Sequence, residues 1–394
     1  MAFLAPDQIP KDMFIQAKEH LPEPLSSAVT NELNFDSTIR TLTKYSLIQS
    51  EKGAFRIHRL LQDVIRQSLG EKKDRYFHYC AGMLNKLFRY DQYDMTTWDN
   101  CAELMPHIQA SLTHGEGLNQ ETEEIAHLYV VGGMWLKHTA LYQQALEWNK
   151  KALAIRKKVL GLEHPDTATT YNNIALVYDS QGDYATALEW HEKALAIREK
   201  VLGLEHPDTA TTYNNIASVY NSQGDYATAL EWHEKALAIR EKVLGLEHPD
   251  TATTYNNIAS VYNSQGDYKA ALLWYKRALA ICEKVLGLEH PDTAGTYNNI
   301  ASVYNSQGDY ATALEWHEKA LAIKVKVLGL EHPDTATTYN NIASVYFSQG
   351  DYQEALKWSE KALAIVEKVL GHDHPNTKTI RENMALVKKV VKSQ

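Results

Sequence analysis

Histidine is the residue type whose spacing in this sequence most invites a chemical role. His191, His233 and His317 occupy equivalent positions of a 42-residue pattern, as the ligands of a metal site or the groups of a pH sensor would. The row also contains Tyr275 and Ser359, and its members are separated by whole repeats. We therefore expect partly exposed histidines that pack between helices, and no bound metal.

The sequence also contains no recognisable catalytic or nucleotide-binding motif. No Ser-His-Asp or Cys-His constellation stands outside the repeated pattern, so the sequence predicts that the protein is not an enzyme. The sequence has no Gly-x-x-x-x-Gly-Lys-Ser/Thr motif and no Gly-Lys pair, which leaves nothing to cradle phosphates or hold magnesium. We expect no cofactor, with ADP or ATP bound only if an upstream ATPase domain exists.

Composition narrows the class of protein. Of 394 residues, 44% are apolar and 23% are charged, which indicates a folded chain, and the net charge of −9 disfavours nonspecific nucleic-acid binding. Three scattered cysteines suit a reducing compartment. The first ten residues lack the pattern of a signal peptide, and no apolar run approaches 18 residues. We expect a cytoplasmic protein with no membrane partner.

Tryptophan spacing reveals the organisation of the chain. Residues 169–210 and 211–252 differ only at Leu176/Ser218 and Asp179/Asn221, so the pattern is an internal repeat. Six tryptophans lie 42 residues apart, at positions 148, 190, 232, 274, 316 and 358.

Each repeat reads as two helices. Tyr171, Ile174 and Tyr178 recur at helical spacing, Gly182 ends the first helix, and Asp183 is suited to cap the second. A helix pair with one apolar face cannot bury that face alone, so successive pairs must stack into a solenoid. The sequence therefore predicts a mainly α fold.

These residues resemble the tetratricopeptide repeat family. The marks are Ala175, Gly182-Asp183-Tyr184, Ala187 and Ala194-Leu195, and the LG-x-x-HPDTA linker looks like that of the kinesin light chain subtype. The resemblance implies a right-handed superhelix whose inner surface binds peptides. It divides the chain into a degenerate first repeat at 119–166, five repeats at 167–376 and a capping helix at 377–394.

Polar residues line the exposed face predicted for the first helices. Side-chain amides offer donors and acceptors to an extended peptide backbone. Neutral or acidic groups there make a strongly acidic ligand unfavourable. An alternative is that one asparagine of each pair bonds a carbonyl of a neighbouring helix or linker. The predicted groove comprises Asn172, Asn214, Asn256, Asn298, Asn340, Ser218, Ser260, Ser302, Asn221, Asn263 and Asn305.

Residues 1–70 precede the repeats and have a different pattern of expected helices, strands and turns. Helices at 11–20 and 36–44, a strand at 45–48, a turn at 51–54 and a strand at 55–58 leading into a helix at 59–68 predict a winged helix. The strings LAPDQIPKDMF, LTKYSLIQ and FRIHRLLQDVIR resemble the winged-helix segment of NB-ARC (STAND-type) signalling ATPases. That resemblance implies an ADP contact for His58, although Arg59 replaces the family's aspartate.

DNA binding by this segment is disfavoured, because residues 1–70 contain eight basic and eight acidic side chains. Residues 71–118 form a predicted helical connector, with Cys80 and Cys101 on its apolar faces.

Two functions remain open at this stage. The first is a non-enzymatic scaffold that binds a peptide or protein in its inner groove. The second is the C-terminal sensor part of a nucleotide-switched signalling receptor. A true kinesin light chain is disfavoured because residues 1–115 contain no heptad coiled coil. Oligomeric state, pathway and a segment upstream of Met1 are left open.

Overall fold

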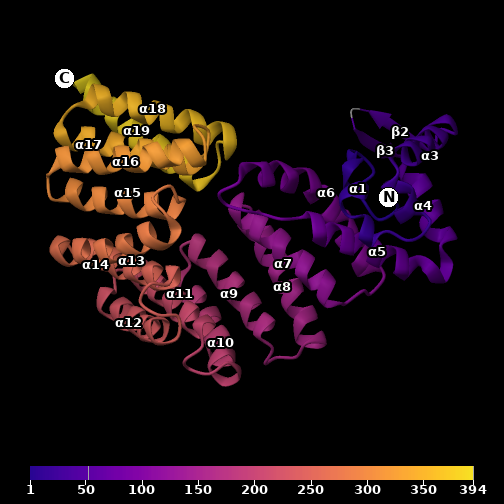
Figure 1. The fold of residues 1–394 in the computed structure, drawn as a ribbon, viewed down its shortest axis with the longest axis horizontal. Coiled ribbons are helices and arrows are strands. Elements are labelled where there is room, and N and C mark those ends of the chain that lie inside the picture. Colours follow the sequence, from indigo (N-terminus) through magenta and orange to yellow (C-terminus); the bar gives the residue numbers. More distant parts are fainter. Residues whose placement is uncertain (52, 394) are drawn as a thin grey trace. The chain divides into compact units, whose positions relative to one another are not determined.

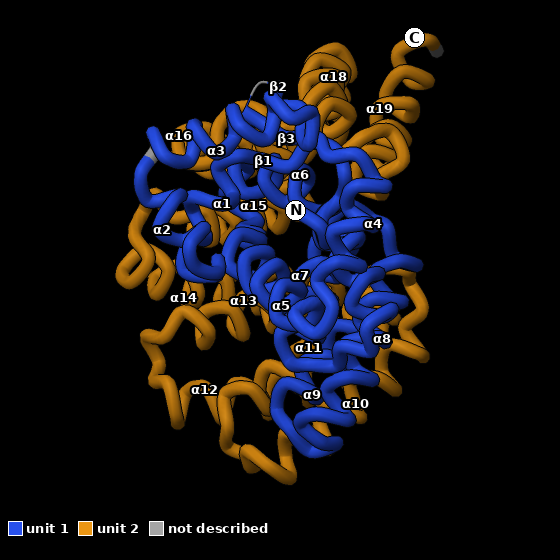
Figure 2. Tube along the Cα trace, turned by 90° about the vertical axis from the view of Figure 1, so that its right-hand side faces the viewer, with its two compact units in different colours: residues 1–174 blue, residues 175–394 orange. Residues whose placement is uncertain are grey.

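The computed structural model describes residues 1–51 and 53–393, which divide into two compact units, residues 1–174 and 175–394 (Figure 2). The boundary falls within helix α9 (Pro165–Ser180). The fold is mainly α-helical, with consecutive helix pairs and one small sheet (Figure 1).

Unit 1 begins with the small sheet and short helices. Strand β3 (Ala54–Ile57) lies between β1 (Ile9–Pro10) and β2 (Ile48–Glu51), and both pairings are antiparallel. Phe14, Phe35 and Phe55 pack against one another beneath the sheet, with ring centroids 6.3–6.5 Å apart. The helices of this region are α1 (Asp12–Gln16), η1 (Lys18–His20), α2 (Leu25–Thr30), α3 (Glu32–Lys44) and α4 (Arg59–Ser68).

The predictions for this region were right in part. Helix α4 has the predicted bounds, but the strand predicted at 45–48 starts only at Ile48, because Tyr45 ends α3 and Ser46 has a φ of 56°. Strand β1 and helix α2 were missed. Lys52, in the predicted turn, lies outside the described residues. The winged-helix relationship stays a prediction.

Unit 1 continues with η2 (Gly70–Lys72), α5 (Lys73–Leu87), α6 (Met95–Gly117), α7 (Glu123–His138) and α8 (Tyr142–Val159). Cys80 and Cys101 are buried, as predicted. Gly132 explains the unusual glycine pair of α7, because a Cβ there would lie 2.2 Å from the Trp148 ring. The glycines let α7 approach α8 closely.

Unit 2 contains stacked helix pairs and ends with a single helix. Its elements are α10 (Tyr184–Val201), α11 (Pro207–Gln223), α12 (Tyr226–Val243), α13 (Pro249–Ser264), α14 (Tyr268–Ile281), the π-helical turn η3 (Cys282–Leu286), α15 (Pro291–Ser306), α16 (Tyr310–Val327), α17 (Pro333–Gln349), α18 (Tyr352–Val369) and α19 (Pro375–Ser393).

Local rules set the helix ends of every repeat. Gly224 ends α11 at a φ of 82°, which is accessible to glycine and strained for other residues. Asp225 then caps α12 by accepting from the Thr228 backbone N–H at 3.2 Å. His206 begins α11, its Nδ1 accepting from the Asp208 N–H at 3.1 Å, and Pro207 occupies the first turn.

Within a pair, aromatic residues join the two helices. Tyr213 and Trp232 lie 5.3 Å apart between ring centroids, and the next three repeats keep the same pairing at 5.3–5.5 Å. Fully buried alanines such as Ala217 and Ala229 let the helices approach closely. The periodic tryptophans are therefore packing residues of the core.

Candidate interaction surface and the seams between repeats

A buried polar network occupies several of the seams, the interfaces between one helix pair and the next. The Asn214 amide on α11 donates to the Thr254 hydroxyl of the following repeat at 3.0 Å, while its Oδ1 lies 2.8 Å from His233 Nδ1 on α12. His233 is 1% exposed and Asn214 is 5% exposed. The same contacts recur two repeats further on, where the Asn298 amide donates to Thr338 at 2.8 Å and Asn298 Oδ1 lies 2.8 Å from His317 Nδ1.

A basic side chain completes the network. Arg240 Nη1 donates to the Thr254 hydroxyl at 2.9 Å and to the Asp250 carbonyl at 2.7 Å. Arg198 makes the same two contacts with Thr212 and the Asp208 carbonyl. These contacts place the guanidinium charge among hydroxyl and carbonyl dipoles of the next repeat.

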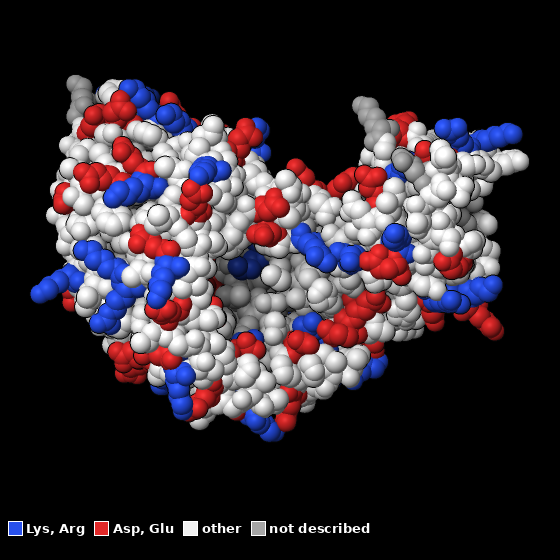
Figure 3. All heavy atoms as spheres, in the orientation of Figure 1, with Lys and Arg blue, Asp and Glu red and all other residues white. Residues whose placement is uncertain are grey.

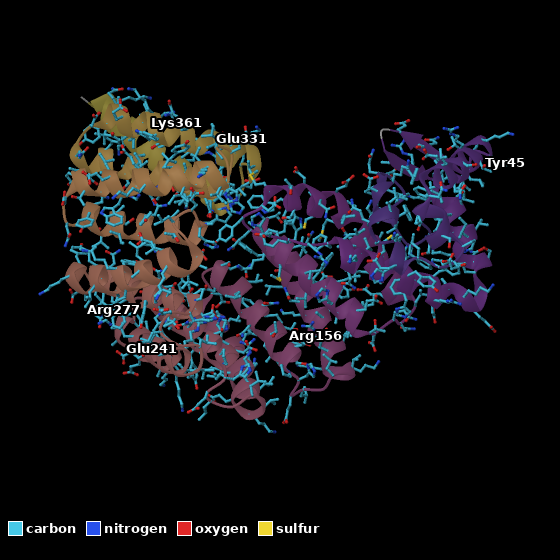
Figure 4. All side chains as sticks on the ribbon, in the orientation of Figure 1. Tyr45, Arg156, Glu241, Arg277, Glu331 and Lys361 are labelled. Carbon is cyan, nitrogen blue, oxygen red and sulfur yellow. The ribbon has the colours of Figure 1, made fainter. Side chains whose placement is uncertain are left out.

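The equivalent seam of unit 1 has a carboxylate partner. Arg156, labelled in Figure 4, donates to Thr170 at 3.0 Å and forms an ion pair with Glu123 at 2.6 Å. Lys324 takes the position in a later repeat, where it reaches the Asp334 carbonyl at 3.1 Å. A basic group therefore recurs at positions 156, 198, 240 and 324.

Burial keeps the seam histidines neutral. It lowers the pKa of His233 to about 4, with a smaller contribution from the positive charge of Arg240. His191 and His317 have the same pKa of about 4 for the same reasons. The prediction of partly exposed histidines was wrong, because His191, His233 and His317 are at most 1% exposed. The imidazoles of His233 and His317 lie between the two helices of their repeats, each 2.8 Å from an asparagine Oδ1.

The first predicted row of asparagines lies mostly within the seams. Asn172, Asn214 and Asn298 are each 5% exposed, whereas Asn256 and Asn340 are partly exposed. Asn214 and Asn298 bond a neighbouring helix, as the structural alternative has it, but the acceptor is a threonine hydroxyl and not the expected carbonyl. Ligand binding by this row stays a prediction.

The other two predicted rows are more accessible. Ser218 and Ser302 are partly exposed and donate to backbone carbonyls one turn earlier, at 3.0 Å, which leaves their lone pairs available. The equivalent Ser260 lies against Tyr275. The last row contains Asn221, Asn263 and Asn305, which are partly exposed as residues. Their amide oxygens are buried and have no hydrogen-bond partner among the described residues.

The charge of this part of the chain is mixed. Figure 3 shows basic and acidic side chains interspersed among uncharged ones. Exposed pairs such as Lys284 and Glu247 link successive linkers, with side chains 63% and 65% exposed, and each contributes little stability. Glu241, also labelled in Figure 4, accepts a 2.6 Å hydrogen bond from the Tyr255 hydroxyl of the next repeat.

One repeat lacks the seam network. In residues 251–292, Tyr275 replaces the histidine and Cys282 replaces the basic residue. Asn256 still donates to Thr296 at 3.1 Å, but its buried Oδ1 has no hydrogen-bond partner among the described residues. The helix also changes to a π-helical turn at Cys282.

Sequence reasoning missed the threonine and arginine members of this network. The signal was present, because both recur every 42 residues and because Cys282 and Tyr275 change together within one repeat.

His58 occupies a different kind of site in unit 1. It caps α4 by accepting from the Leu60 N–H at 3.2 Å, and its side chain is exposed. A cavity of about 400 Å³ beside it is lined by Arg56, His58, Arg59 and the residues at 6–7, 46–49 and 57. Arg56 also pairs with Asp7 at 2.7 Å.

Residues 1–51 and 53–393 contain no candidate metal centre and no candidate membrane-spanning helix. No group of three or more His, Cys, Asp or Glu side chains there is placed to hold a metal ion. None of the helices in this part of the chain has the length and apolar character needed to cross a membrane.

Family models match most of the chain. A model described as tetratricopeptide repeat matches residues 124–200, 208–284, 292–357 and 334–389. A second model, described as a domain of unknown function (DUF7779), matches residues 1–74. A relative from Hyaloscypha variabilis, named as a nucleotide-binding leucine-rich repeat (NLR)-like protein, is 36% identical over 137 residues. That alignment covers 34% of this chain and only 14% of the relative.

Solved structures share the fold. A Rap protein complexed with competence and sporulation factor matches over 97% of this chain and 96% of its own, with a TM-score of 0.51 and 15% identity. A repeat protein from Parabacteroides merdae matches over 78% and 99%, with a TM-score of 0.51 and 17% identity. A putative kinesin light chain from Podosopora anserina is 30% identical, covering 52% and 98%, with a TM-score of 0.43.

The neutral seam histidines predict acid sensitivity. An unfolded histidine binds its proton near pH 6.5, whereas His233 in the fold does so only near pH 4. Between these values the unfolded state binds more protons, so the free energy of unfolding falls as the pH drops. The loss is about 2 kcal/mol for His233 at pH 5. Urea unfolding at pH 7 and pH 5 should show this loss reduced in His233→Tyr.

The exposed His372, whose side chain is 74% exposed, supplies the control. His372→Gln should keep the pH dependence of the unchanged protein. An equal pH dependence in His233→Tyr and the unchanged protein would contradict the neutral, buried assignment.

The interrupted repeat predicts a stabilising double substitution. Tyr275→His with Cys282→Arg should supply a donor to Asn256 Oδ1 and restore the arginine contact with Thr296. We expect the free energy of unfolding in urea to rise by about 1 kcal/mol. Tyr275→Phe, which supplies no donor, is the control and should not stabilise. A double variant less stable than the unchanged protein would show that the network does not transfer between repeats.

Proposed function

Because the chain belongs to the tetratricopeptide repeat family, we propose that it is a non-enzymatic interaction scaffold that binds an extended peptide or protein segment along its first helices. The fold of this family presents stacked first helices to protein partners. The proposed binding surface comprises the serine row Ser218, Ser260 and Ser302 and the asparagine row Asn221, Asn263 and Asn305.

This proposal rests on the positions at which successive repeats differ. Two nearly identical units differ only at 176/218 and 179/221, and these positions lie in the two partly exposed rows. The buried seam and the core are unchanged between the same units. Change confined to an exposed face fits recognition better than it fits packing.

The chemistry of the rows favours a backbone ligand. Serine hydroxyls can accept from peptide N–H groups, and asparagine amide nitrogens can donate to peptide C=O groups, so no charged side chain is required. The central rows at 218, 260 and 302 and at 221, 263 and 305 contain no charged residue. The proposed ligand is therefore an extended, weakly charged segment.

The seam network supports this surface from beneath. Asn214 connects α11 to the following repeat through Thr254, and Ser218 lies one turn further along the same helix. Fixed seams hold equivalent side chains at a constant spacing, so an extended ligand meets a preformed surface and loses less entropy on binding.

A test begins with random dodecapeptides displayed on phage and selected on the unchanged chain. A selected peptide should bind about tenfold more weakly when Asn221, Asn263 and Asn305 are all changed to Ala, because several backbone contacts are lost. Fluorescence anisotropy measures the affinity, and circular dichroism verifies the fold.

Lys235→Ala is the matched control, because Lys235 is exposed and lies over the Trp232 ring on the second helix. This variant should bind the peptide normally. Unchanged affinity in the triple variant would refute the proposed surface.

A second candidate function is a sensor segment of a nucleotide-switched receptor. The cavity lined by Arg56, His58 and Arg59 favours it, and the partial similarity to an NLR-like protein is consistent with it. His58 already caps α4 through Nδ1, which leaves Nε2 to face a phosphate. In this candidate, an ATPase domain would supply the rest of the nucleotide site.

Calorimetry with ADP tests whether the chain alone is sufficient. Since the sequence has no phosphate-binding glycine loop, we expect heats equal to those of dilution, for the unchanged chain and for His58→Ala alike. Saturable ADP binding that His58→Ala abolishes would show that the site is complete without another domain.

A further inference from the structure

The last seam of unit 2 replaces the polar network with smaller and apolar residues. Ser359 stands where earlier repeats have His233 and His317, and Val366 stands where they have a basic residue. Ile380 of α19 replaces the threonine that bonds the asparagine in earlier seams. Asn340 is left with a 3.4 Å contact from the Asn383 amide.

A cavity opens at this seam. It has a volume of about 140 Å³, lies between α17, α18 and α19, and includes Ser359 in its lining. In earlier repeats a buried imidazole fills the equivalent space, as His317 does beside Asn298. The exchange of a ring for a hydroxymethyl group accounts for the opening.

Apolar residues form one side of the cavity. Phe347 stands one repeat beyond Asn305 in the asparagine row, and Leu386 stands two repeats beyond Ser302 in the serine row, after Ser344. Leu386 is a large aliphatic residue, yet it is 53% exposed. Val387 and Ala343 complete the apolar lining, and Asn340 and Asn383 are polar groups at the same site.

We propose that this cavity is an anchor subsite that takes one aliphatic side chain of the peptide lying along the serine and asparagine rows. The inference rests on the proposed function, since the subsite lies at the end of those rows. The volume is close to that of an engineered apolar cavity of about 150 Å³ that holds a benzene-sized guest. A leucine, isoleucine or methionine side chain fits.

The surroundings define the ligand further. Amide groups of Asn340 and Asn383 are placed to bond the ligand backbone beside the anchor. Lys389 follows Leu386 by one helical turn and is exposed. Its charge disfavours a lysine or arginine next to the anchor, so the neighbouring residue is neutral or acidic.

The experiment introduces residues that the chain itself has at the equivalent positions of other repeats. Ser359→His places in the cavity the side chain that positions 233 and 317 accommodate, so the variant is expected to fold. Leu386→Ser removes the apolar wall by restoring the residue of the row. Both substitutions should weaken the binding of a phage-selected dodecapeptide by about tenfold or more, because burial of its aliphatic side chain is lost.

Two further measurements separate packing from binding. N-acetyl-leucine methylamide should shift the Leu386 and Val387 methyl resonances of the unchanged chain and leave those of Ser359→His unshifted. Ser222→Ala, on an exposed side chain at the end of α11, is the control and should bind both probes normally. Selected peptides should share an aliphatic residue at one position.

The outcomes distinguish the two proposals. If the unchanged chain selects no peptide, the proposed function fails. If it selects peptides that lack a shared aliphatic position and bind Ser359→His with unchanged affinity, the anchor subsite is refuted and the binding rows stand. Loss of binding in Ser359→His and Leu386→Ser with retained fold supports the subsite.

Discussion

A helix pair with a single apolar face has no place to bury that face except against the next pair, and this constraint governs the repeats. The seam between successive pairs does the work that a closed core does in a compact domain. Buried alanines allow close approach, and the Tyr213–Trp232 type of pairing joins the two helices of one repeat. Everything exposed on the first helices is positioned by these contacts.

The seams also contain buried charge, which apolar packing alone would not require. Arg240 is 5% exposed and finds carbonyl and hydroxyl groups of the next repeat rather than a carboxylate. Neutral His233 and Asn214 extend the same network within their own repeat. Because each donor requires an acceptor at one register, the network favours a single stacking arrangement of nearly identical repeats.

The polar network is interrupted in one seam of the array and replaced in another. Tyr275 and Cys282 interrupt it in the middle, and Ser359, Val366 and Ile380 replace it at the end. In the second case the loss of an imidazole leaves a cavity beside Phe347 and Leu386. The exchange of the histidine of earlier repeats for Ser359 thus turns a filled seam into one with a surface cavity, although the helix pair is kept.

The sequence by itself determined the repeat length, the helix pairs and the capping residues, because these depend on local periodicity and on side chains such as Asp183 and Gly182 that act within a few residues. It also identified the rows along the first helices. Only the tertiary structure decided which members of those rows are exposed. Asn214 and Ser218 lie one helical turn apart, yet the first is bonded across the seam at Thr254, 40 residues away, and the second is partly exposed. Burial at a seam depends on the residues of the neighbouring repeat, and periodicity within one helix does not contain that information.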